Sequence, residues 1–411
     1  MSIPAAVLAR PEHRLLLLCA CHVHSPAVKK TLTELVTQNL DWDYLLPRLK
    51  INGLMALFSH HLQRQEALLP PMALQSLQQE FGQSLQKRLV MLTELQQIVT
   101  AFGGAEIRVL AYKGPTLAYI AYGSVALRPF SDLDLLIARE DKARAVAVLK
   151  QLGYLPDNDK ALSDAAEAKR QLRDYEMTLR PTNGLGRVDL HWAVAPPYDG
   201  FPLHFEALWE RRVASQLLPD AETFCREDLI LTLCAHGLKH RWMRLEWIGC
   251  LRAFLHNSTE TPLDWKQIEQ TAASLRCRRA LYLGLQLALD LAELDAPHQT
   301  IVGQNIPLDL RRKMEADSVV KRLSQQVWQE RFHPRNSHQL FISVPDLVFA
   351  IRAREGWKQR SSYFFAIWRA FLLPEAEDIH NSSGSWLRMY LKRFSQLIFR
   401  RLHRLIVQRR F

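Results

Sequence analysis

Two aspartates in one short stretch of the 411-residue sequence have a spacing suited to metal-assisted chemistry. Asp132 and Asp134 alternate with leucines in residues 130–137, a pattern that predicts a β-strand. Alternate side chains of a strand share one face, so the two carboxylates should emerge together while Leu133 enters the core. Such close carboxylates repel each other unless water or a hard divalent cation lies between them. An exposed edge strand is the plainer interpretation of the same pair.

A third acid, Asp189, stands in a second alternating run at residues 187–192, which predicts a neighbouring strand. Three acids on adjacent strands are typical of two-metal phosphoryl transfer, in which Mg²⁺ is held by carboxylate oxygens and substrate phosphates. We therefore expect Asp132, Asp134 and Asp189 to be both the catalytic residues and the metal ligands.

A phosphate-binding turn is expected just before these strands, at Lys113 and Gly114. Residues 107–112 predict a buried strand, and the helix after Gly114 would have Pro115 in its first turn. A helix N-terminus presents free N–H groups to an anion, and Lys113 adds a positive charge. Arg128 is a further candidate for phosphate contact. Alternatively, Lys113 ends a strand in solvent, and Arg128 pairs with Asp132 or braces the loop.

Three histidines are secondary candidates. His191 shares a strand face with Asp189, but a histidine hydrogen-bonded to a carboxylate is as good an interpretation as a catalytic one. His236 and His240 share a helix face at a spacing known from metal pairs. No glutamate follows His236 and no third ligand is evident, so packing or substrate contact is favoured. Nearby aromatic and basic residues would line a nucleotide or acceptor cleft, or belong to the core: Lys239, Arg241, Trp242, Arg244 and Trp247.

These motifs resemble the nucleotidyltransferase superfamily, which has a polymerase-beta-like fold, a glycine turn, a strand with two alternating aspartates and a third carboxylate. More narrowly, the chain is similar to the bacterial uncharacterised nucleotidyltransferase family found among surface-polysaccharide and peptide-modification genes. The similarity rests on Lys113-Gly114, Arg128, residues 131–134, residues 188–191 and residues 236–245. It implies a nucleoside triphosphate substrate, Mg²⁺ or Mn²⁺, and phosphate contacts by Lys113, Gly114, Arg128 and Ser131.

Two departures from the family pattern stand out. The superfamily's Gly-Ser turn is Lys-Gly here, so phosphate binding would rest on backbone N–H groups and the lysine charge. In the later helical motif, Gly249 and Cys250 stand where the family often carries an acid.

The expected fold class is α+β, with a small mixed sheet as the nucleotidyltransferase core, because helix and strand patterns alternate without repeated strand–helix–strand units. A long helix over about residues 72–102, ended by Gly103 and Gly104, should precede the core. The expected organisation is a helical region at 1–103, the core at 104–195, a helical region packing on it at 196–300, a helical region at 301–384 and a basic amphipathic helix at 385–411.

Composition narrows the class of protein. No run of apolar residues is long enough to span a membrane, and the six cysteines form no regular framework, so a cytoplasmic protein is expected. Residues 385–411 hold eight Lys and Arg and no acid, which accounts for most of the formal net charge of +11. Such a helix suits peripheral contact with an anionic membrane or docking onto the protein itself. Nucleic acid is not expected as a partner.

The sequence therefore favours an enzyme that moves a nucleoside monophosphate from a nucleoside triphosphate to a hydroxyl or phosphate of an unknown acceptor. The alternative is a non-catalytic nucleotide-binding or scaffold protein, recruited to a membrane or partner by its basic tail.

Overall fold

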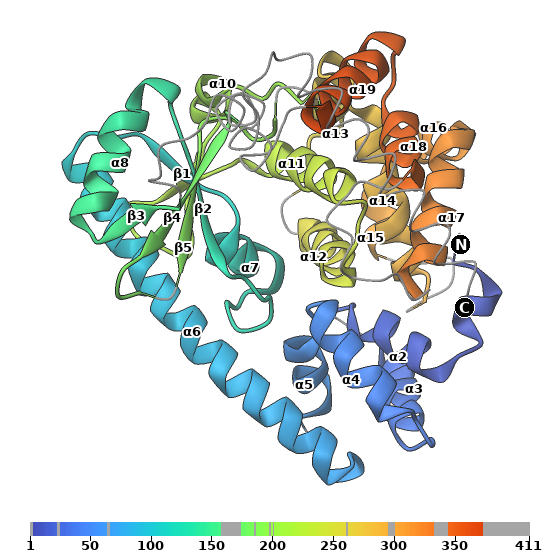
Figure 1. Ribbon diagram of the computed structural model, residues 1–411. Coiled ribbons are helices and arrows are strands. Elements are labelled where there is room, and N and C mark those ends of the chain that lie inside the picture. The colour runs from blue at the N-terminus through green and yellow to red at the C-terminus, as the bar shows by residue number, and fades with distance from the viewer. Residues whose placement is uncertain are drawn as a thin grey trace, which may run out of the picture.

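The computed structural model describes residues 3–22, 25–63, 66–157, 174–184, 186–196, 199, 201–259, 262–294, 301–332 and 344–372. The basic segment 385–411 lies outside these residues. Within them the protein is α+β, as predicted: a mixed sheet is flanked by helices (Figure 1).

The sheet has seven strands in the order β3-β4-β5-β2-β1-β7-β6. Their bounds are β1 Val109–Ala111, β2 Asp132–Ile137, β3 Tyr154–Pro156, β4 Glu176–Pro181, β5 Arg187–His191, β6 Val213–Ala214 and β7 Glu222–Thr223. β2 lies at the centre, antiparallel to β1 and parallel to β5. The two acidic stretches of the sequence are therefore hydrogen-bonded neighbours.

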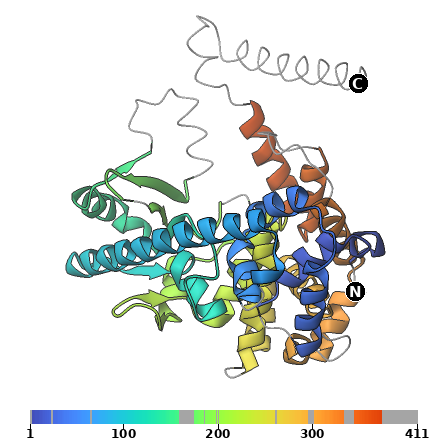
Figure 2. The same cartoon turned by 90° about the horizontal axis from the view of Figure 1, so that it is seen from below.

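One face of the sheet is closed by two helices, α6 (Pro71–Gly104) and α8 (Lys142–Gln151). The odd-numbered residues of β2 point into this layer, where Leu133, Leu135 and Ile137 are at most 1% exposed. The helix α6 is long enough to reach from the sheet to the N-terminal helices, and it runs along the molecule in both views (Figures 1 and 2). The even-numbered positions of β2 are left to face the opposite side.

On that opposite side lie α7 (Gly114–Tyr122), α11 (Arg226–Lys239) and α12 (Leu245–His256). Behind them the remaining helices form an extended helical body that shares one core with α7 and the sheet. These helices are α1 Ala5–Leu8, α2 Pro11–Cys19, α3 Pro26–Val36, α4 Trp42–Ile51, α5 Met55–Leu62, α10 Phe205–Glu210, α13 Trp265–Ser274, α14 Arg278–Ala292, α15 Ile301–Asn305, α16 Leu308–Ala316, α17 Ser318–Phe332, α18 Val344–Ala353 and α19 Trp357–Leu372.

Glycine permits the closest approach within this helical body. Gly249 of α12 faces the chain just after α2, and a Cβ built on it would lie 2.2 Å from the carbonyl oxygen of Ala20. Both residues are buried. The chain after α2 therefore meets α12 through direct backbone contact, which accounts for the glycine at this position.

The local predictions around the acidic strands are confirmed. The helix α6 ends at Gly104, and the strand, turn and helix after residue 107 are β1, Gly114 and α7. The expectation that residues 196–300 are helical was incomplete, because β6 and β7 extend the sheet there. Each has only two residues, too few to show an alternating pattern.

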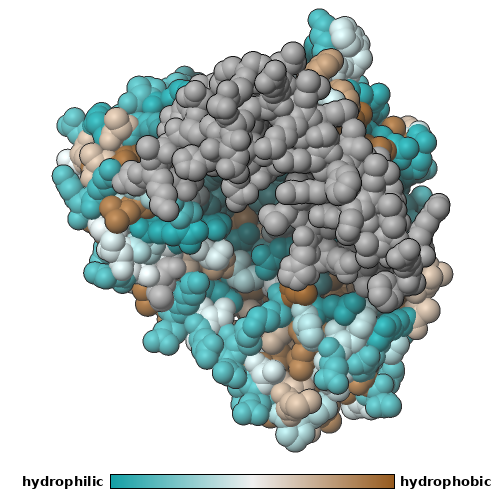
Figure 3. Space-filling model, in the orientation of Figure 1, coloured by the Kyte–Doolittle hydropathy of each residue, from teal (hydrophilic) through white to brown (hydrophobic). Residues whose placement is uncertain are grey.

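None of the described helices is long and apolar enough to cross a membrane. The coloured surface over the N-terminal helices and α6 is largely hydrophilic, with single apolar residues scattered through it (Figure 3).

Substituting Gly249 with alanine should destabilise the protein by about 1–3 kcal/mol, because the new methyl group meets the backbone at Ala20. The free energy of unfolding in urea measures this. The matched control is Gly82→Ala in α6, where a Cβ would meet nothing within 4 Å. There we expect no loss, or a gain of about 0.5–1 kcal/mol, since alanine suits a helix interior better than glycine. Equal stability of the two variants would contradict the close contact.

Candidate active site

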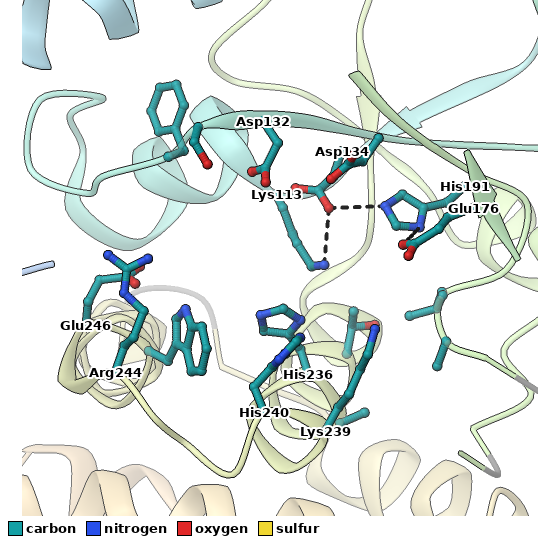
Figure 4. Close-up of a pocket in the computed structure, with 18 of the residues that line it drawn as sticks. Lys113, Asp132, Asp134, Glu176, His191, His236, Lys239, His240, Arg244 and Glu246 are labelled. Atoms are coloured by element: carbon teal, nitrogen blue, oxygen red, sulfur yellow. Dashed lines mark hydrogen bonds and ion pairs between the residues drawn. The ribbon is translucent and has the colours of Figure 1, made fainter. Parts of the chain in front are cut away.

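The register of β2 against β5 gathers the acidic residues on one face of the sheet. Asp134 is paired with Asp189 across the two strands, and Asp132 is paired with Arg187. All four side chains line a cavity of about 400 Å³ between the sheet and α11. The three acids of the predicted triad therefore line one cavity. Figure 4 shows Asp132 and Asp134 on the sheet side of this cavity, across from His236 and Lys239.

Asp134 is the most tightly held of the three acids. Its Oδ1 lies 3.2 Å from Lys113 Nζ and 3.2 Å from His191 Nε2, and the residue is 9% exposed. Burial alone would raise the pKa of Asp134, but the lysine charge and the histidine contact more than offset it and hold the pKa well below its usual value. This carboxyl group is ionised throughout the neutral range.

Asp132 and Asp189 share one cation. Arg187 Nη2 donates to Asp132 Oδ2 at 2.7 Å and lies 3.4 Å from Asp189 Oδ2. The hydroxyl of Thr178 donates to Asp189 Oδ1 at 2.7 Å. Burial raises the pKa of Asp189 and the charges of Asp134 and Asp132 raise it further, partly offset by Thr178 and Arg187. Asp189 is therefore more basic than an ordinary aspartate.

The opposite wall of the cavity belongs to α11 and α12. His236 and His240 lie one turn apart with ring centres separated by 4.6 Å, and both rings contact Trp247 at 5.2 and 5.4 Å. Burial, with the nearby lysine charges, lowers the pKa of His236 well below its usual value and that of His240 to about 3. Both rings are neutral at physiological pH.

A tight turn between α11 and α12 sets this wall. Arg241 and Trp242 both adopt a left-handed backbone with φ of 53°. The indole of Trp242 folds back against Gly237, where a Cβ would lie 2.4 Å from the ring, and is 1% exposed. The turn brings Arg244 back to the cavity while Arg241 points away and pairs with Asp346 of α18. Trp242 is thus a core residue.

Three of the four predicted phosphate-binding residues line the cavity, and the fourth does not. Lys113, Arg128 and Ser131 line the cavity, and Gly114 does not. Gly114 has a left-handed φ of 53°, and a Cβ there would lie 3.0 Å from the carbonyl oxygen of Asp132. This position thus favours glycine on backbone grounds.

Arg128 is held within the protein. Its Nε lies 2.7 Å from Glu246 Oε1, and both residues are less than 10% exposed. The alternative weighed from sequence, a bracing ion pair, is therefore present, although the partner is Glu246 of α12 rather than Asp132. Its predicted contact with a phosphate stays a prediction.

The structure places further polar residues at the site that were not among the candidate site residues predicted from the sequence. Arg187 carried a signal, because it lies two residues before Asp189 and so shares its strand face. Glu176, whose Oε2 lies 3.4 Å from His191 Nδ1, carried none. Arg244 lines the cavity and has no ion pair among the described residues.

Carboxylate oxygens are the donors that a hard divalent cation prefers, and three carboxylates line this cavity, but they are not gathered around one point. In the described part of the chain, no group of three or more His, Cys, Asp or Glu side chains is placed to hold a metal ion. Lys113 and Arg187 supply the positive charge among these carboxylates instead.

Comparison with known proteins gives one family. The model of a family described as "Uncharacterised nucleotidyltransferase" matches residues 38–293. Among solved structures, the solution structure of the antibiotic-resistance factor ANT(2'')-Ia is similar at 17% identity and a TM-score of 0.31, over 47% of this chain and 93% of that one. A comparison with curated proteins found no match.

The neutral histidines predict a pH-dependent stability. Below a pH of about 6.5 both rings are protonated in the unfolded chain and neutral in the folded chain. The free energy of unfolding should therefore decrease as the pH is lowered, by up to about 1.4 kcal/mol per pH unit for each ring. His240→Gln should make this slope shallower in urea unfolding between about pH 7 and about pH 4.5. Exposed His204 gives the matched control, His204→Gln, which should keep the wild-type slope. If His240→Gln keeps the wild-type slope, His240 is not held neutral in the folded protein.

Proposed function

Because this chain belongs to the uncharacterised nucleotidyltransferase family, we propose that it transfers a nucleoside monophosphate from a nucleoside triphosphate to a hydroxyl or phosphate of an acceptor. The proposal rests on one observation: acidic side chains and basic or aromatic side chains line opposite walls of the same cavity. Three carboxylates line one wall, and Lys239, Arg244 and Trp247 line the other. The carboxylates of the first wall would bind the cation that accompanies a triphosphate. The basic side chains of the second wall would bind its phosphates, and the indole would contact its base.

Asp132, Asp134 and Asp189 would hold Mg²⁺ or Mn²⁺, in a two-metal arrangement that offsets charge on the triphosphate. Lys113 and Arg187, which now neutralise these carboxylates, would then be available to phosphate oxygens. Arg244 needs no such release, since no described side chain pairs with it.

Asp189 is our candidate for the general base, because it lies beside Asp134 on the neighbouring strand, faces the cavity and is hydrogen-bonded by Thr178 rather than paired with a lysine. The acceptor oxygen forms a bond to the α-phosphorus, and its proton passes to Asp189. The bond from the α-phosphorus to the bridging oxygen breaks, and pyrophosphate leaves with the electron pair. His191, fixed between Asp134 and Glu176, would keep the central carboxylate oriented.

Other aspects of the proposal rest on the sequence. Peripheral membrane contact through residues 385–411 follows from their charge, and a cytoplasmic location follows from the cysteine pattern. A role in bacterial polysaccharide biosynthesis follows from the family resemblance. All three stay proposals beside the catalytic one.

Replacing Asp132 or Asp134 with asparagine should abolish metal-dependent triphosphate binding and pyrophosphate release, because each variant loses a charged oxygen ligand but keeps its shape. Calorimetric titration of ATP, GTP, CTP and UTP with Mg²⁺ measures the binding and identifies the donor. Asp157→Asn, at an exposed aspartate outside the cavity, is the control and should behave as wild type. Full turnover in both site variants would reject this site. Triphosphate binding without pyrophosphate release for any acceptor would favour the non-catalytic alternative.

Arg244→Gln should raise the dissociation constant for the triphosphate about tenfold, since a hydrogen bond to a charged group contributes about 1.5–3 kcal/mol. The same titration measures it. The matched control is Arg312→Gln, which removes an exposed arginine of α16 that does not line the cavity. An unchanged dissociation constant in Arg244→Gln would remove this residue from the binding site.

A further inference from the structure

A second cavity adjoins the first. It has a volume of about 210 Å³ and is lined by α11, α18, α19, the α13–α14 junction and the segment after β5. Four residues line both cavities: Ala195, Ala235, Lys239 and His240. One turn of α11 is therefore the common wall, and a molecule seated in the second cavity extends past Lys239 and His240 toward the acid triad. Figure 4 shows these two side chains reaching from α11 into the first cavity.

The walls of the second cavity are largely apolar. Phe201, Leu238, Ala280 and Ile367 present hydrocarbon from four separate elements. The volume is about half that of the first cavity. These walls suit one ring or a short apolar chain.

The charged residues of this cavity favour an anion. Among the described residues that line it, the one acid is Asp199, which is paired with Arg354 at 2.7 Å, and Arg354 lies 3.4 Å over the ring of Tyr363. Arg276 lines the cavity with an exposed side chain and forms no ion pair within the described residues. Lys239 adds a further positive charge at the common wall, where its Nζ donates to the hydroxyl of Tyr175. A cationic ligand would be repelled by these basic side chains, and the described residues offer it no unpaired carboxylate.

The backbone fixes where Arg276 stands. It ends the turn after α13 in a left-handed conformation with φ of 53°, and the next residue, Cys277, is buried as the N-cap of α14. The side chain is thus directed by a defined turn between two helices, at the edge of the cavity.

We propose that the second cavity is the acceptor subsite, and that the acceptor is a small anionic molecule with an apolar body and a hydroxyl group. Its carboxylate or phosphate lies against Arg276, its apolar part lies between α11, α14 and α19, and its hydroxyl reaches the α-phosphorus past His240. The identification of this ligand as the acceptor rests on the proposed nucleotidyl transfer. The preference of the cavity for an anion rests only on its own lining residues.

The test uses four probes that share one hydroxyphenyl ring: 4-hydroxyphenylacetate, 4-hydroxybenzylphosphonate, the neutral 4-hydroxyphenylethanol and the cationic tyramine. Ligand-observed NMR measures their binding to the full-length protein without nucleotide. We expect the two anions to bind and the neutral and cationic probes to bind at least about fivefold more weakly. The tighter of the two anions tells whether the natural group is a carboxylate or a phosphate.

Two variants locate the binding. Arg276→Ala should weaken the anionic probes about fivefold, since Arg276 is exposed and solvent screens its charge. Its matched control is Arg278→Ala, at an exposed arginine of α14 that lines neither cavity, which should change nothing. Ala350→Phe should abolish probe binding, because Ala350 lines only the second cavity and a phenyl ring fills it.

The outcomes separate this inference from the proposed function. No binding of either anion to the folded protein, equal binding of tyramine, or binding that survives both Arg276→Ala and Ala350→Phe overturns the subsite. Titration of triphosphate with Mg²⁺ into the same samples tests the first cavity independently. With both sites established, transfer of the nucleotide label to the hydroxyl of a bound anionic probe confirms the acceptor role. Label found only on water or on tyramine refutes it.

Discussion

The compensation of charge around Asp134 is the interaction on which the candidate site depends. A carboxylate that is nearly buried between two other acids is stable only if cations accompany it. Lys113 reaches it from the turn before α7 and His191 from β5, so three elements separated in sequence meet at one oxygen atom. These two contacts hold the pKa of Asp134 low, whereas burial and the charges of the neighbouring acids raise that of Asp189, so the two acids differ in basicity.

The second wall depends on sterics. Gly237 allows the indole of Trp242 to fold under α11, and this allows the sharp turn that returns Arg244 and Trp247 to the cavity. On its other side the same helix lines the second cavity. One helix, fixed by one glycine and one tryptophan, therefore separates the place of the nucleotide from the place we propose for its acceptor.

The acidic face could be predicted because it follows from short-range rules. Strand alternation fixes which face Asp132 and Asp134 share, and a turn needing a left-handed residue explains Gly114. The pairing of Arg128 with Glu246 could not be predicted, because it depends on how α12 packs against α7, more than a hundred residues away in sequence. Likewise, nothing local marked Glu176 as the partner of His191, and strands of two residues are invisible to periodicity.

The docking of the N-terminal helices on α12 has a consequence for how the chain is made. Ala20 leaves the ribosome more than two hundred residues before Gly249, its contact partner. At a synthesis rate of about 5–20 residues per second, Ala20 is made roughly ten to forty-five seconds before the residue of α12 that it contacts. The contact between Ala20 and Gly249 therefore cannot form until more than half of the chain has been made.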